Sequence, residues 1–166
     1  MDDIKIIPVT TDDALLETSK LADEIWHQHF TPLIGIKQVE YMLQKFQSYE
    51  AMQRQTEKEG YQYYLLSFNG KNVGYTAIVP NKDFLFLSKI YVLKDYRGKK
   101  IAKTAIAFMI DLCKQSSLSK ISLTVNRRNL NTIMAYEKLG FKIIEEKKAD
   151  IGNDYYMDDY IMELHI

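Results

Sequence analysis

Hydrophobic and polar positions repeat with two different periods along this chain of 166 residues. Apolar residues spaced at three and four positions predict helices, whereas alternation and short apolar runs predict strands. The helical pattern covers Leu15 to His29, Val39 to about Gly60, residues 101–112, and Asn129 to Leu139. The strand pattern covers residues 4–7, 61–68, 73–79, 84–93, 121–125, 141–147 and 155–165.

Turn and cap residues agree with these boundaries. Thr10 and Thr11 precede the first helix and are good N-cap residues, and Gly140 suits a helix C-terminus. Asn69-Gly70 predicts a tight hairpin turn between two strands. The nearly continuous apolar run from Phe84 to Leu93 predicts a strand covered on both faces.

The order of these elements predicts the fold class. An antiparallel start followed by strand–helix–strand units indicates an α/β domain of three layers, α/β/α, with a mixed central sheet of about seven strands. No linker or repeat divides the chain, so residues 1–166 are expected to form one domain. The last strand is expected to leave an exposed edge that a homodimer would use.

Composition excludes several classes of function. The formal net charge is zero, which argues against a nucleic-acid-binding protein. Cys113 is the only cysteine, so no internal disulfide or thiolate-rich metal site is expected, and we expect no metal. The acidic start of the chain does not resemble a signal peptide, and no run approaches the ~20 apolar residues of a membrane span. We therefore expect a cytoplasmic protein that does not bind membranes.

A basic turn follows the apolar strand. Lys94, Arg97, Lys99, Lys100 and Lys103 surround Gly98 and lead into the helix that begins at Ile101. The first turn of a helix offers free N–H groups and the positive end of the helix dipole, so this turn is a candidate site for a pyrophosphate. The spacing of a P-loop is absent, and a solvated basic turn is the simpler alternative.

A second motif lies near the C-terminal end. Asn129 is a candidate N-cap, and Ile133, Tyr136 and Gly140 follow at helical spacing; residues 136–141 read Tyr-Glu-Lys-Leu-Gly-Phe. Asn129, Ile133 and Tyr136 are thus expected to share a face that packs on the sheet. Taken alone, Tyr136 would be interpreted as an ordinary core residue.

Together, the two motifs resemble those of the GCN5-related N-acetyltransferase superfamily over roughly residues 73–145. Arg97 matches the first position and Ala102 the last position of its pyrophosphate-binding pattern, Q/R-x-x-G-x-G/A. Lys100 replaces the middle glycine, which in the pattern permits close approach of the backbone to phosphate. The N-terminal part, with Trp26 and Phe30, also resembles bacterial diamine and polyamine acetyltransferases.

The resemblance implies a fold, a co-substrate and site residues. The sheet should open in a V between the strands that end near Val92 and Val125, and acetyl-CoA should lie there. Tyr136 would be the general acid that protonates the leaving thiolate when an amine attacks the thioester directly. The donor would be held by Ile90, Val92, Arg97, Gly98, Lys99, Lys100, Ile101, Ala102, Lys103 and Asn129.

The acceptor and the general base stay open. The apolar strand carries no carboxylate, so the candidates for the general base lie in the first helix: Glu24, His27 and His29, of which the histidines titrate near neutral pH. Trp26 in the same helix is a candidate for the lining of the acceptor pocket. Residues 149–160 contain four aspartates and three tyrosines, which suits a small cationic amine such as a polyamine. A solvated acidic hairpin is the alternative.

Other functions compete with a small-molecule acetyltransferase. A non-catalytic acyl-CoA sensor would not need a proton donor at Tyr136, and a protein lysine or N-terminal acetyltransferase would use the same donor site. A covalent route through Cys113 is disfavoured, because this residue lies within a helix and has no histidine near it in sequence.

Overall fold

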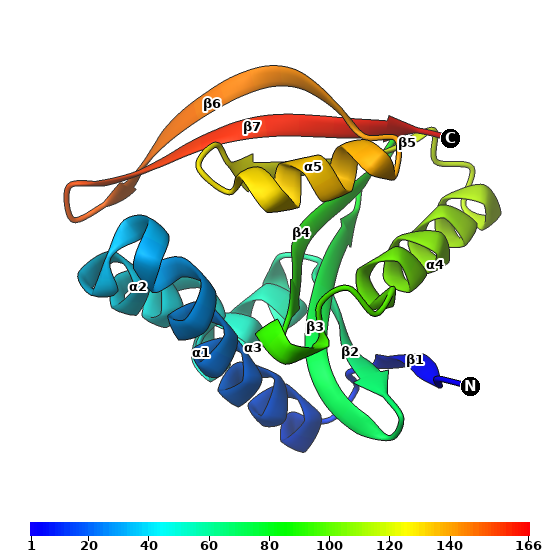
Figure 1. Ribbon diagram of the computed structural model, residues 1–166, viewed down its shortest axis with the longest axis horizontal. Coiled ribbons are helices and arrows are strands. Elements are labelled where there is room, and N and C mark those ends of the chain that lie inside the picture. Colours follow the sequence, from blue (N-terminus) through cyan, green and yellow to red (C-terminus); the bar gives the residue numbers. More distant parts are fainter.

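The computed structural model describes residues 1–166, which form one seven-stranded sheet in the order β1-β2-β3-β4-β5-β7-β6 with helices around it (Figure 1). The strands are β1 (Ile4–Pro8), β2 (Gln62–Phe68), β3 (Lys71–Pro80), β4 (Leu85–Val92), β5 (Lys120–Asn126), β6 (Lys142–Gly152) and β7 (Tyr155–His165). The helices are α1 (Asp12–Ile34), α2 (Ile36–Met42), the π-helix η1 (Leu43–Gln47), α3 (Tyr49–Lys58), the short 3-10 helix η2 (Lys94–Tyr96), α4 (Ile101–Gln115) and α5 (Leu130–Lys138).

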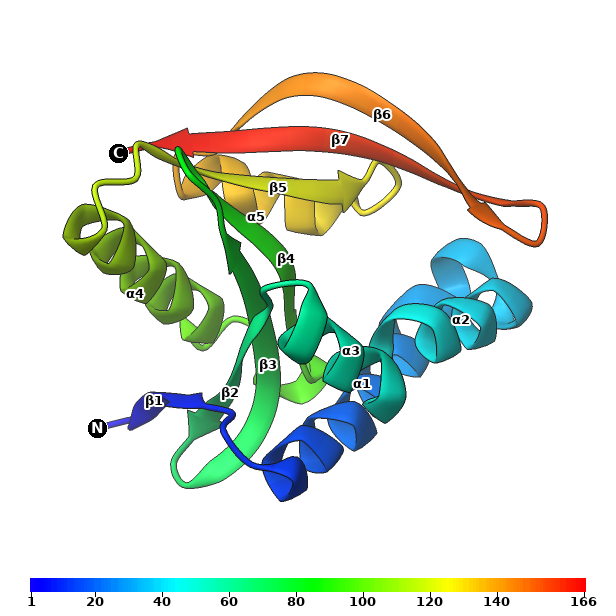
Figure 2. The ribbon, with the colours of Figure 1, turned by 180° about the vertical axis from the view of Figure 1, so that it is seen from behind.

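The sheet opens between its two parallel strands, as expected. β4 and β5 pair only from Leu85–Leu87 to Ile121–Leu123 and then diverge, whereas every other neighbouring pair is antiparallel. Figure 2 shows the same divergence from behind. The edges of β4 and β5 beyond Leu87 and Leu123 therefore have no strand between them and are free to bind an extended ligand.

Helices cover both faces of the sheet, which gives the predicted three layers. Tyr63 and Tyr64 are neighbours on β2, so their side chains point to opposite faces. The Tyr63 hydroxyl donates to Gln55 of α3 at 2.6 Å, whereas the Tyr64 ring lies 5.2 Å from that of Phe108 in α4. The helices α3 and α4 thus lie on opposite sides. None of these helices combines the length and the hydrophobicity that a membrane span requires.

Most of the predicted boundaries are confirmed within a few residues. The Thr11 hydroxyl caps α1 by accepting from the Ala14 N–H at 3.1 Å. Asn69 and Gly70 both have positive φ, 50° and 86°, as the predicted hairpin turn requires. Gly140, with φ of 102°, follows the end of α5.

Two predictions about single elements were wrong. The helical pattern from Val39 to Gly60 is three helices, because Ser48 adopts an extended conformation after the π-helix and caps α3 through its hydroxyl. In β4, one face is buried and the other, with Ser88 and Ile90, is only half-buried. That second face borders the opening between β4 and β5, and Ile90 lines a groove there together with Ile101 and Ala102 of α4.

The predicted free edge of the last strand is also wrong. β7 lies between β5 and β6, so that β6 is the edge strand at this end of the sheet. The β6–β7 hairpin extends beyond the sheet to α2, where the Tyr41 hydroxyl donates to the Ile151 carbonyl at 2.7 Å. The Gln38 amide also donates to the Tyr156 carbonyl at 3.3 Å. The hairpin thereby closes the opening of the sheet from above.

Candidate active site

The basic turn forms one end of a surface groove. After η2, the backbone has positive φ at Gly98 (78°) and at Lys100 (68°), and α4 begins at Ile101 without a side-chain cap. Glycine adopts this left-handed conformation without steric cost, whereas at Lys100 the chain accepts that cost. The N–H groups of the first turn of α4 are therefore available to an anion.

The groove, which we call the outer groove, runs from this turn to α5. The Arg97 Nε donates to the Val92 carbonyl at 3.1 Å, so the guanidinium stays at the end of β4, and its partial burial lowers its pKa. Predicted donor-site residues that line the outer groove are Ile90, Val92, Arg97, Gly98, Lys100, Ile101, Ala102 and Lys103, and the predicted general acid Tyr136 lines it as well.

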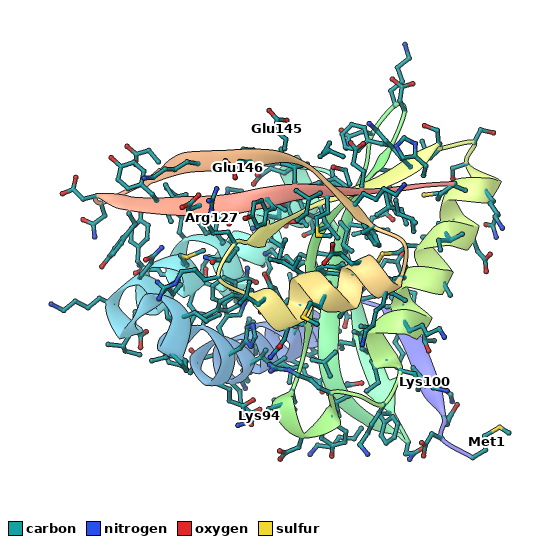
Figure 3. The ribbon with its side chains drawn as sticks, turned by 45° about the horizontal axis from the view of Figure 1, so that its top comes forward. Met1, Lys94, Lys100, Arg127, Glu145 and Glu146 are labelled. Atoms are coloured by element: carbon teal, nitrogen blue, oxygen red, sulfur yellow. The ribbon has the colours of Figure 1, made fainter.

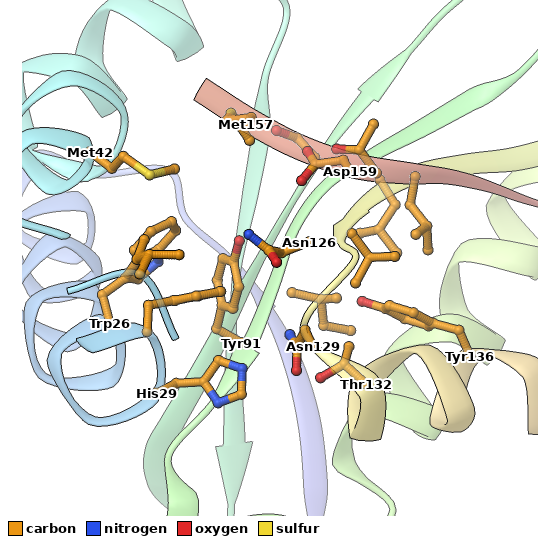
Figure 4. A pocket seen from close by; sticks show the side chains of 18 of the residues that line it. Trp26, His29, Met42, Tyr91, Asn126, Asn129, Thr132, Tyr136, Met157 and Asp159 are labelled. Atoms are coloured by element: carbon orange, nitrogen blue, oxygen red, sulfur yellow. The ribbon is translucent and has the colours of Figure 1, made fainter. Parts of the chain in front are cut away.

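Lys99 and Asn129 are placed differently. Lys99 does not line the outer groove, because its ammonium lies 5.7 Å above the ring of Phe68. Asn129 directly precedes α5, but the prediction that its side chain caps the helix is wrong, because the side chain forms no cap hydrogen bond. It is buried instead, on the side of the opening that faces His29 (Figure 4).

Tyr136 occupies the face of α5 that packs on the sheet, as its spacing predicted. The side chain is buried, and its ring lies 5.5 Å from that of Phe141. Burial raises the pKa of the Tyr136 hydroxyl far above its usual value, so the group stays protonated at neutral pH. In Figure 4 the hydroxyl points into the cavity rather than into the core.

A second cavity, the inner cavity, continues from the outer groove between β4, β5, α1 and the hairpin. Residues that line both are His29, Ile90, Val92, Arg97, Thr132 and Tyr136. Side chains that line the inner cavity alone include Trp26, Phe30, Gln38, Met42, Tyr91, Asn126, Met157 and Asp159. A ligand in the outer groove would thus meet a ligand in the inner cavity beside Tyr136.

Of the four candidates for the acceptor side, Trp26 and His29 line the inner cavity. Burial and the charge of Arg97 lower the pKa of His29, and a contact with the Asn129 amide opposes the shift. Glu24 is exposed and outside the cavity. His27 is also outside, because its ring is held by the Glu40 carboxylate at 2.9 Å and the Asp23 carbonyl at 2.7 Å. The hydrogen bond with Glu40 is the main cause of the raised pKa of His27.

Partners within the protein reduce the negative charge of the hairpin segment 149–160, which the sequence predicted to be an acidic rim. The Arg127 Nε lies 2.9 Å from an Asp158 carboxylate oxygen, and Asp150 accepts from the Gly152 N–H at 2.8 Å. Figure 3 shows Arg127 beside Glu146 of the hairpin, with which it also forms an ion pair of 3.5 Å, and places Lys94 and Lys100 below α5, away from the hairpin. Most of the predicted acidic rim is therefore neutralised or solvated.

Asp159 is the exception, and sequence reasoning did not single it out. It is buried, it lines the inner cavity, and burial raises the pKa of its carboxyl to about 6. Because side chains alternate between the two faces of a strand, Asp159 lies on the face opposite to Asp158 and on the same face as Met157. Which of the two faces points inward depends on how β7 pairs, and this was not readable from the pattern.

The uncapped helix N-terminus, the open strand edges and the buried tyrosine are together the features of an acyl-CoA-dependent acyltransferase. The sequence model of the acetyltransferase (GNAT) family matches residues 21–141, and the chain belongs to this family.

Comparison with individual proteins agrees with this membership. A Bacillus subtilis (strain 168) protein provisionally named a ribosomal protein bS18-alanine N-acetyltransferase is 27% identical over 97 residues, which are 58% of this chain and 61% of that protein. The chain thus spans about three fifths of the length of the curated relatives it matches.

Solved structures share the fold over the whole chain. The PaiA N-acetyltransferase of Thermoplasma acidophilum, in complex with coenzyme A, has a TM-score of 0.79 at 19% identity and covers 100% of this chain and 99% of its own. The ribosomal-protein-S18-alanine N-acetyltransferase of Escherichia coli has a TM-score of 0.69 at 22% identity and covers 100% of this chain and 94% of its own.

Proposed function

We propose that the protein transfers the acetyl group of acetyl-CoA to a primary amine by direct attack, with Tyr136 as the general acid. The observation that carries the proposal is the position of Tyr136. Its protonated hydroxyl lies where the outer groove meets the inner cavity, which is where a thioester and an amine would come together. A general acid at this point would protonate the thiolate of coenzyme A as it leaves.

The residues of the outer groove fit acetyl-CoA as the donor substrate. The first turn of α4 and the side chains of Arg97, Lys100 and Lys103 offer N–H donors and positive charge to the phosphates. The open edge of β4 at Ile90 and Val92 offers backbone groups to the pantetheine arm, as an added strand would use them. Cys113 lies in the core, and burial raises its pKa, which supports direct transfer over a thiol intermediate.

The acceptor is proposed to be a small cationic amine that enters the inner cavity. Aromatic side chains and Asp159 line this cavity, and the hairpin closes it from above. The names of the Bacillus subtilis and Escherichia coli relatives favour a second candidate, the N-terminal amine of a protein.

The test follows the release of free thiol from acetyl-CoA with a panel of amines. The panel holds monoamines, polyamines, amino acids, lysine peptides and a peptide that begins with alanine. We expect turnover with one class, slowed roughly 10²-fold to 10⁴-fold in Tyr136→Phe while acetyl-CoA binding is retained. Tyr156→Phe, which changes an exposed hairpin tyrosine, is the matched control and should leave the rate unchanged.

Acetyl-CoA binding without thiol release from any amine would favour the sensor function over catalysis. Failure to bind acetyl-CoA would refute the proposal at its first step.

A further inference from the structure

A carboxylate without a partner lies in the wall of the inner cavity. Asp159 is 5% exposed, and it shares the inward face of β7 with Met157. Its carboxyl accepts no hydrogen bond and forms no ion pair within the protein; the charges that act on it are those of Asp158, which is unfavourable, and Lys147, which is favourable. Burial of an ionised group without a partner is costly, so the position is explained best by a cationic ligand.

Aromatic side chains cover the opposite wall of the cavity. The ring of Trp26 lies 4.2 Å from that of Phe30 and 5.5 Å from that of Tyr91. Figure 4 shows Trp26 and Met42 across the cavity from Tyr136, with Asp159 on the β7 side of the cavity. Such walls bind hydrocarbon and, through their ring faces, a cation. Asp159 is the only carboxylate among the residues that line the cavity, so the cavity provides a counter-charge for one ammonium group.

We propose that Asp159 receives the ammonium group of the acceptor and removes its proton before the attack, and that the acceptor is a primary amine with one cationic centre beside an apolar body. This inference rests on the proposed acetyl transfer and specifies its acceptor and its general base. It places the proton acceptor on β7, whereas the proton donor, Tyr136, lies on α5.

The proton balance of the reaction assigns a step to each group. Asp159 takes one proton from the ammonium and passes it to solvent, which leaves a neutral amine. The amine nitrogen bonds to the acetyl carbon, the carbon–sulfur bond breaks, and the Tyr136 hydroxyl protonates the departing thiolate. The amide nitrogen loses its second proton as the adduct collapses, and this proton restores the Tyr136 hydroxyl. One proton is released to solvent in each turnover.

His29 is the other basic group at the site. It lines both the outer groove and the inner cavity and lies near Arg97, whose charge lowers its pKa and would repel an ammonium. Asp159 lines only the inner cavity and attracts the ammonium. The titratable and charged groups around Asp159 come from each neighbouring element: Tyr91 on β4, Arg127 after β5, Tyr136 on α5, Lys147 on β6, Asp158 on β7 and His29 on α1.

The first test measures binding without turnover. Phenethylammonium is titrated into the protein saturated with coenzyme A, and binding is followed by calorimetry and by the ¹³C signals of the aspartate carboxyls. We expect Asp159→Asn to bind about tenfold to hundredfold more weakly than the wild type, because a charged partner is lost. Asp154→Asn, at the exposed tip of the same hairpin, is the matched control and should bind as the wild type does.

The second test compares phenethylamine with its β,β-difluorinated analogue. The two fluorine atoms beside the aminomethyl group make this amine a much weaker base, which is largely neutral at neutral pH. A proton acceptor matters less for an amine that is already neutral. Asp159→Asn should therefore lose far more of its rate with phenethylamine than with the analogue, and Asp154→Asn should lose none with either.

The outcomes separate this inference from the proposed function. Absence of phenethylammonium binding, or equal binding by the wild type and Asp159→Asn, overturns the inference even if another amine is acetylated. Equal loss of rate with both amines would show that Asp159 does not accept the proton. Tighter binding of putrescine than of phenethylammonium would refute the choice of a monocationic acceptor. Loss of acetyl-CoA binding in the wild type would instead refute the proposed function.

Discussion

The side-chain Nζ of Lys89 donates to the backbone carbonyl of Phe46 at a distance of 2.5 Å. Lys89 belongs to β4 and is buried, and it also donates to Gln55 at 3.0 Å and to the Tyr63 hydroxyl. No carboxylate forms an ion pair with it. The hydrogen bonds join the strand that forms one wall of the active site to the π-helix and to α3, so a buried amine sets the position of that wall.

Lys89 should make stability depend on pH. Burial lowers its pKa well below the usual value, so above the folded-state pKa the unfolded chain binds a proton that the folded protein does not. The free energy of unfolding then rises with pH until the unfolded lysine also loses its proton, near pH ~10.4. We expect the wild type to gain stability relative to Lys89→Met between neutral pH and about pH 10. Urea unfolding of both proteins across this range measures the difference, and parallel curves would contradict the prediction.

Replacing Lys100 by glycine should stabilise the protein, because Lys100 has a left-handed backbone conformation. Lys100→Gly relieves a steric cost of about 1 kcal/mol and should raise the free energy of unfolding by up to that amount. Lys100→Ala is the control, because it removes the same charge but keeps the Cβ atom. If the lysine charge contributes to donor affinity, both variants should bind acetyl-CoA more weakly at low salt, and the difference should shrink as salt screens the charge.

Asp159 should destabilise the unliganded protein above its pKa. Its folded-state pKa of about 6 exceeds the ordinary value of 3.8, so the folded protein holds the proton of this carboxyl more tightly than the unfolded chain does. The resulting contribution to the free energy of unfolding is present at acidic pH and is lost as the pH rises through about 6. Asp159→Asn should therefore be more stable than the wild type at neutral pH, by about 1–2 kcal/mol after allowance for solvent. The advantage should disappear near pH ~4. Thermal unfolding at both pH values tests this, with Asp154→Asn expected to follow the wild type.

The contact between the hairpin and α2 should affect the acceptor more than the donor. Tyr41→Phe removes the hydrogen bond to the Ile151 carbonyl and should cost about 1 kcal/mol of stability. With an accepted amine, the KM for the amine should rise, while calorimetry should show unchanged affinity for acetyl-CoA. An unchanged KM for the amine would mean that the hairpin does not shape the acceptor site.

The donor side was more readable from sequence than the acceptor side, for a physical reason. The basic turn and the helix at Tyr136 are continuous segments, so local periodicity and caps determine what they present. Asp159 and Trp26 lie 133 positions apart in the chain and meet only through the pairing of β7 with β5 and the packing of α1. Nor does local sequence reveal that Lys89, in a strand expected to be apolar, would be satisfied by groups from η1 and α3.

The hairpin is attached to α2 through its backbone, since the Ile151 and Tyr156 carbonyls are the acceptors of the bonds from Tyr41 and Gln38. Any residue at positions 151 and 156 presents the same carbonyl. Substitutions along the hairpin can therefore change the lining of the inner cavity while the hairpin stays attached to α2. The basic turn before α4, which lies apart from the hairpin, is untouched. The architecture permits acceptor preference to diverge among related chains without renewed optimisation of donor binding.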